Sequence, residues 1–80
     1  MEQWTVYGFK KINFKDKTGK QISGFNLFLV REPLPDSGIT GSEVMKLFIS
    51  SDYVTYTPKV ADVVNLIYNR YGKVGSIQVV

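Results

Sequence analysis

Hydrophobic and polar residues alternate along most of the chain, and Gly, Pro, Asp and Ser interrupt this alternation about every ten residues. A period of two is typical of strands with one buried face, whereas the interruptions are typical of turns. The sequence therefore predicts an all-β domain of antiparallel strands. The five expected strands lie near residues 4–15, 20–31, 42–50, 61–69 and 73–80.

The first two expected strands are long, and each has a glycine near its middle, Gly8 and Gly24. Such glycines favour β-bulges, which let a strand bend and serve both halves of a small barrel. Asp16 to Gly19 is a polar turn that joins the two strands as a hairpin, and we expect loops over 32–38 and 51–59. This layout predicts a five-stranded OB-like small barrel, with an SH3-like barrel as the alternative.

One side of each expected strand is apolar enough to form the core. We expect the first strand to bury the side that begins at Trp4 and Val6. The predicted core comprises Val6, Ile12, Phe14, Phe25, Leu27, Leu29, Leu47, Ile49, Val64, Leu66, Ile77 and Val79.

The length of 80 residues predicts a single domain over 1–80, and a domain of this size buries a small core. Cysteine and histidine are both absent from the sequence, so neither a disulfide framework nor a zinc site of the usual ligands is expected. No cofactor is expected either. Association of two copies is the remaining means of stabilisation, and we therefore expect a homodimer.

Enzymatic activity is not expected from this composition. General acid and base catalysis relies mostly on His or on paired carboxylates, and nucleophilic catalysis needs an activated Ser, Cys or Thr. The seven carboxylates are scattered over turns and strand ends. The sequence also shows no apolar run long enough for a membrane span and no signal-peptide pattern, so we expect a cytoplasmic protein.

The charge of the chain is unevenly distributed, although its formal net value is only +3. Residues 1–31 carry six cationic and two acidic side chains, residues 32–62 carry two and five, and residues 63–80 carry two and none. Basic ends that meet in space would form a basic face, which favours an anionic partner such as nucleic acid.

The first strand carries the most informative row of side chains. Tyr7, Phe9, Lys11, Asn13 and Lys15 alternate along it, and this row faces solvent if the opposite side is buried. Rings stack on bases and lysines pair with phosphates, so such a row is typical of single-stranded nucleic-acid binding. Alternatively, a bulge at Gly8 reverses the alternation and turns the two rings toward the core.

Two turns add basic and aromatic side chains that could flank the same groove. One is the first hairpin tip, and the other is the turn between the last two strands. If the three elements converge on one face, they form a binding surface for single-stranded DNA, with RNA as an alternative. The candidate residues are Tyr7, Phe9, Lys11, Lys15, Lys17, Lys20, Arg70, Tyr71 and Lys73.

Several segments resemble, in order and spacing, the small single-stranded-DNA-binding proteins of phages and plasmids of the gene V protein type. They are Lys17-Thr18-Gly19-Lys20, Gly41 with Val44-Met45-Lys46-Leu47-Phe48-Ile49-Ser50, Tyr56-Thr57-Pro58-Lys59-Val60, Tyr71-Gly72-Lys73-Val74 and Ile77-Gln78-Val79-Val80. The resemblance covers residues 15–80. It implies an OB-type barrel, a homodimer, cooperative coating of single-stranded DNA, and a bacterial or phage-infected host cytoplasm.

A second function class remains open at this point. As the alternative, exposed aromatic residues and strand edges would serve a small phage or mobile-element protein that binds another protein. Added salt separates the two readings, because phosphate contacts weaken steeply with salt and apolar contacts do not.

Overall fold

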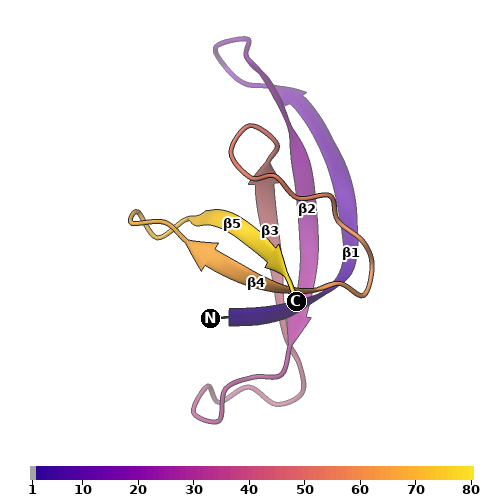
Figure 1. Cartoon of the computed structure of the whole chain (residues 1–80), viewed down its shortest axis with the longest axis vertical. Coiled ribbons are helices and arrows are strands. Elements are labelled where there is room, and N and C mark those ends of the chain that lie inside the picture. The colour runs from indigo at the N-terminus through magenta and orange to yellow at the C-terminus, as the bar shows by residue number, and fades with distance from the viewer. Residues whose placement is uncertain (1) are drawn as a thin grey trace.

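The computed structural model describes residues 2–80, which form a single five-stranded antiparallel sheet and no helix (Figure 1). The strands are β1 Glu2–Lys15, β2 Gln21–Arg31, β3 Glu43–Ser50, β4 Val63–Tyr68 and β5 Val74–Val79. The all-β prediction is confirmed, and each predicted strand end lies within two residues of the observed one. Over this range, no helix is long and apolar enough to cross a membrane.

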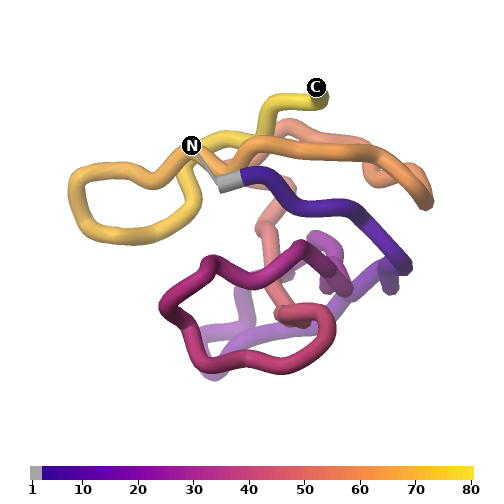
Figure 2. Tube along the Cα trace, turned by 90° about the horizontal axis from the view of Figure 1, so that it is seen from below, coloured from indigo at the N-terminus to yellow at the C-terminus, as the bar shows by residue number. Residues whose placement is uncertain are grey.

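The strand order in the sheet is β3-β2-β1-β4-β5. The long β1 bends, so that its first residues pair with β4 and the rest pairs with β2 (Figure 1). Seen along the long axis, the β4–β5 hairpin and the β1–β2–β3 strands form two separate layers (Figure 2). The sheet does not close, because β3 and β5 are both edge strands without hydrogen-bonded pairing to each other.

A β-bulge at Gly8 causes the bend in β1, as the sequence indicated. Val6 is paired with Leu29 and Gly8 with Phe28, so Tyr7 is the extra residue of the bulge. An extra residue shifts the side-chain alternation by one position. Beyond the bulge, Phe9 therefore shares a face with the buried Leu27.

This shift overturns part of the predicted core. Ile12 and Phe14 were expected inside, but the bulge turns them to the side of the sheet away from the buried residues. Phe14 is accordingly exposed. Val79 lies on the inner side but is also exposed, because β5 is an edge strand that nothing covers in the described chain.

The core lies between the two layers and is small. Six of the predicted core residues are buried, and three more are partly buried and pack against them. Trp4 and Val54 complete the core, the latter from the connection between β3 and β4. The buried residues are Trp4, Val6, Leu27, Leu29, Ile49, Val54, Val64 and Leu66, and the three partly buried ones are Phe25, Leu47 and Ile77.

Arg31 covers one end of this core. Its Nε donates a hydrogen bond to Glu43 Oε2 at 2.6 Å, and its guanidinium lies 4.3 Å from the centre of the Trp4 ring. A cation that is itself held by a carboxylate thus lies over the Trp4 ring. Because Trp4 is buried, its fluorescence will report folding and not base stacking.

Gly24, in contrast to Gly8, is not a bulge. The pairing of β2 with β1 and with β3 continues through it without a shift. Gly24 instead allows the backbone of β3 to lie very close to that of β2, because a Cβ added at Gly24 would lie 2.0 Å from the Ile49 carbonyl oxygen. The expectation of a second bulge was therefore wrong, and β3 instead lies against the bare backbone of β2.

Candidate nucleic-acid interface

We call the side of β1–β2–β3 that faces away from the core the outer face. Cross-strand pairing places Phe28 beside Lys46 and Phe48 in one row with Asn26 and Lys10. Phe14 lies further along β1 on the same side, and its ring centre is 6.5 Å from that of Phe48. The functional side chains of the outer face are Lys10, Phe14, Phe28, Lys46 and Phe48.

The three phenylalanine rings remain 46%, 42% and 41% exposed at Phe14, Phe28 and Phe48. Two of them lie over glycines of the neighbouring strand. A Cβ at Gly8 would be 3.7 Å from the Phe28 ring, and one at Gly24 would be 3.1 Å from the Phe48 ring. Since glycine has no side chain, these two rings lie close to the backbone of the neighbouring strand and remain partly open to solvent.

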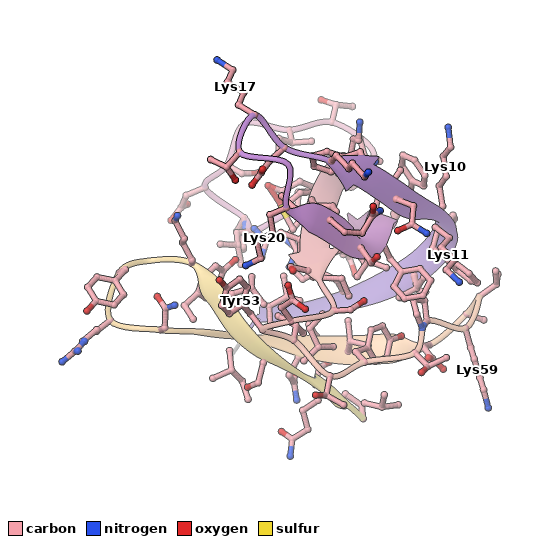
Figure 3. All side chains as sticks on the ribbon, turned by 90° about the horizontal axis from the view of Figure 1, so that it is seen from above. Lys10, Lys11, Lys17, Lys20, Tyr53 and Lys59 are labelled. Atoms are coloured by element: carbon pink, nitrogen blue, oxygen red, sulfur yellow. The ribbon has the colours of Figure 1, made fainter. Side chains whose placement is uncertain are left out.

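The β1–β2 hairpin tip is held in shape by Asp16. Its Oδ1 accepts hydrogen bonds from Thr18 Oγ1 at 2.6 Å, Thr18 N at 2.9 Å and Lys20 N at 3.0 Å. The Thr18 side-chain hydrogen bond is the main cause that lowers the pKa of Asp16 below its ordinary value. The tip therefore keeps its form at neutral pH and presents the exposed Lys17 and Lys20 to solvent (Figure 3).

The β4–β5 turn is organised in the same manner by Asn69. Its Oδ1 accepts hydrogen bonds from Tyr71 N at 2.9 Å and Lys73 N at 3.1 Å. The Arg70 guanidinium lies 5.1 Å from the centre of the exposed Tyr71 ring, close enough for a cation–π contact. This turn therefore holds a cation and a ring against each other at its tip.

The structure does not bring all the sequence-predicted site residues together. The bulge separates Tyr7 from the rest of the row, and it turns Phe9, Lys11 and Lys15 to the inner side of the β1–β2 hairpin. Phe9 packs edge-on against Phe25, with 6.0 Å between ring centres. The bulge therefore reverses the alternation at Phe9, but the expectation that both rings join the core was wrong, because Phe9 is 40% and Tyr7 67% exposed.

The predicted convergence of three basic elements is likewise not observed. Lys10 and Lys11 lie on one side of the molecule, and the β4–β5 turn with Arg70, Tyr71 and Lys73 extends from the opposite side (Figure 3). Lys17 and Lys20 belong to the β1–β2 hairpin tip, which lies at the upper end of the molecule in Figure 1. The basic side chains therefore belong to separate surfaces.

Sequence reasoning missed the outer face because it counted the alternation forward from Trp4. Counting backward from the turn at Asp16 would have placed Phe14, Ile12 and Lys10 together, without crossing the bulge. The pairing of Phe28 and Phe48 with glycine-containing strands could not be counted, because it depends on register.

Comparison with known proteins identifies no relative of this chain. No protein-family model, no curated protein and no solved structure matches it.

Proposed function

We propose that this chain is a non-enzymatic single-stranded-DNA-binding protein, and that the bound DNA crosses the outer face. The observation that carries the proposal is the set of three half-exposed phenylalanine rings interleaved with Lys10 and Lys46. Each base offers a flat face for stacking and each nucleotide a phosphate for a cation. Neither contact depends on base identity, so the binding requires no particular sequence.

The fold supports this proposal by analogy. The order β3-β2-β1-β4-β5 is that of an OB fold opened between its third and fifth strands. OB folds bind oligonucleotides on the face of their second and third strands, beside the loop that joins strands one and two. In this chain the same region holds Phe28, Lys46 and Phe48, and the neighbouring loop holds Lys17 and Lys20.

A protein partner is the second candidate. The same exposed rings and the two free strand edges would serve an apolar contact with another protein. The two lysines among the rings favour the nucleic acid, because an apolar docking surface is usually depleted of lysine.

The salt dependence of binding tests the proposal. We expect Lys10→Ala and Lys46→Ala each to flatten the plot of log K against log salt by about 0.7, the value for one phosphate contact on a single strand. The measurement is fluorescence anisotropy of a labelled dT oligonucleotide over a range of NaCl concentrations. Lys59→Ala is the matched control, since Lys59 is exposed but lies in the β3–β4 connection, outside the outer face (Figure 3).

Two results would contradict this prediction. One is equal flattening by all three variants, which would mean that only net charge matters. The other is an affinity that hardly changes with salt, which would favour the protein-binding alternative. An RNA oligonucleotide of equal length decides which nucleic acid is preferred.

A homodimer remains a prediction. The end of β5 is an unpaired edge with Val79 and Val80 exposed, and such an edge can pair with a second copy. We expect sedimentation at high micromolar concentration to give twice the 9.1 kDa of one chain. Val79→Lys should shift it to the monomer, because a charge on the edge opposes pairing, and a monomeric parent protein would exclude the dimer.

A further inference from the structure

A groove of about 860 Å³ lies in the open part of the sheet, between β3 and the β4–β5 hairpin. Leu47 of β3 and Val74 of β5 form part of its apolar floor. Both are only partly buried, because no hydrogen-bonded strand joins β3 to β5. The groove is therefore a place where the core is accessible from outside.

Three aromatic residues line this groove, from three different segments. Phe48 comes from β3, Tyr53 from the connection after it, and Tyr68 from the end of β4. Tyr53 is 77% exposed, so its ring is available to a ligand. Rings at the border of an apolar slot are suited to hold a flat apolar group between them.

The charges around the groove are mostly cationic, although the acidic Asp52 is next to Tyr53 in the chain. Among the residues that line it in the described chain, Lys73 is the only charged one. Arg70 lies in the adjoining turn, and Lys20 of the hairpin tip extends on the same side of the molecule as Tyr53 (Figure 3). The groove thus combines flat rings with cations, which suits an anionic ligand that carries flat groups.

We infer that this groove receives unpaired bases of the same single-stranded DNA molecule that crosses the outer face. This inference rests on the proposed function. Phe48 lies between the two surfaces, since its ring is on the outer face and its position in the edge strand β3 also borders the groove. A DNA strand that leaves the outer face at Phe48 can therefore continue into the groove. Its bases would point toward Tyr53 and Tyr68, and its phosphates toward Lys73.

Charge complementarity favours nucleic acid over a second copy of the chain as the occupant. A second copy has a net charge of +3 and would meet the cations of the groove with its own. The expected dimer contact at Val79 leaves the groove free, because only Val74 and Gly75 of β5 line it.

The length of the oligonucleotide provides the test. A dT oligonucleotide of about 4 nucleotides should occupy the outer face alone, whereas one of about 12 should reach the groove as well. We expect the double variant Tyr53→Leu/Tyr68→Leu to bind the longer one at least about fivefold more weakly and the shorter one as well as the parent does. Its salt slope should stay unchanged, because stacking releases no counterions.

Tyr7→Leu is the matched control, because Tyr7 is exposed to a similar degree but lies on β1, away from the groove. Trp4 fluorescence during heating verifies that each variant still folds. Parent-like binding of the longer oligonucleotide by the double variant would overturn the inference while the proposed function stands. So would a change in sedimentation with unchanged DNA affinity, which would identify the groove as a contact between copies. Failure of the parent protein to bind either oligonucleotide would instead overturn the proposed function.

Discussion

Gly24→Ala is expected to destabilise the protein by about 3 kcal/mol, the upper end of the usual cost of overpacking, whereas Gly8→Ala is expected to be nearly neutral. A domain of this size is stable by only about 4–12 kcal/mol, at about 0.05–0.15 kcal/mol per residue. The Gly24 variant should therefore lose a large part of its stability, from the addition of a single methyl group.

The reason is what the added Cβ would meet. At Gly24 it would lie 2.0 Å from the Ile49 carbonyl oxygen and 3.0 Å from the Ile49 carbonyl carbon, which are backbone atoms paired in the β2–β3 ladder. Backbone cannot turn away as a side chain can, so β3 would have to separate from β2. At Gly8 the nearest atom is a ring carbon of Phe28 at 3.7 Å, an ordinary contact.

Thermal and urea unfolding followed by Trp4 fluorescence measure this difference. The Gly8 variant is the control for the general effect of replacing a strand glycine by alanine. Equal stability of the two variants would contradict the close approach of β3 to Gly24. It would also remove the basis for the position of the Phe48 ring, which lies over that glycine.

The double variant Phe28→Leu/Phe48→Leu is expected to reduce the affinity for single-stranded DNA at least about tenfold. Removing a stacking ring costs about 1–3 kcal/mol per base, and two rings are removed together. Leucine still covers Gly8 and Gly24 with apolar atoms, so the fold should persist. The salt slope should not change, because both lysines of the outer face remain.

Phe9→Leu is the control for this experiment. Phe9 is 40% exposed and Phe48 is 41% exposed, but the two rings lie on opposite sides of the sheet. We expect Phe9→Leu to bind DNA as the parent does. The reverse result, in which Phe9→Leu loses affinity and the double variant keeps it, would place the strand on the inner side of the β1–β2 hairpin.

The local features of this protein follow from its sequence alone. Alternation of apolar residues and the position of the turns determine where each strand begins and ends, because both act over a few neighbouring residues. The hairpin tip at Asp16 and Gly19 is a clear case. A side-chain acceptor and a glycine with φ of 84° make this turn in any context that pairs the two strands.

Only the tertiary structure decided which side of each strand faces the core. A bulge at Gly8 is recognisable in the sequence, but the number of residues it adds depends on the register with β2. That one residue exchanged the expected sides of Phe9 and Phe14, although both rings remain partly exposed. Whether the sheet closes is also a long-range property, because it depends on β3 and β5, which are separated by the whole β3–β4 connection and β4. The exposed Val79 and the groove beside Phe48 both result from that opening, so no local pattern could have indicated them.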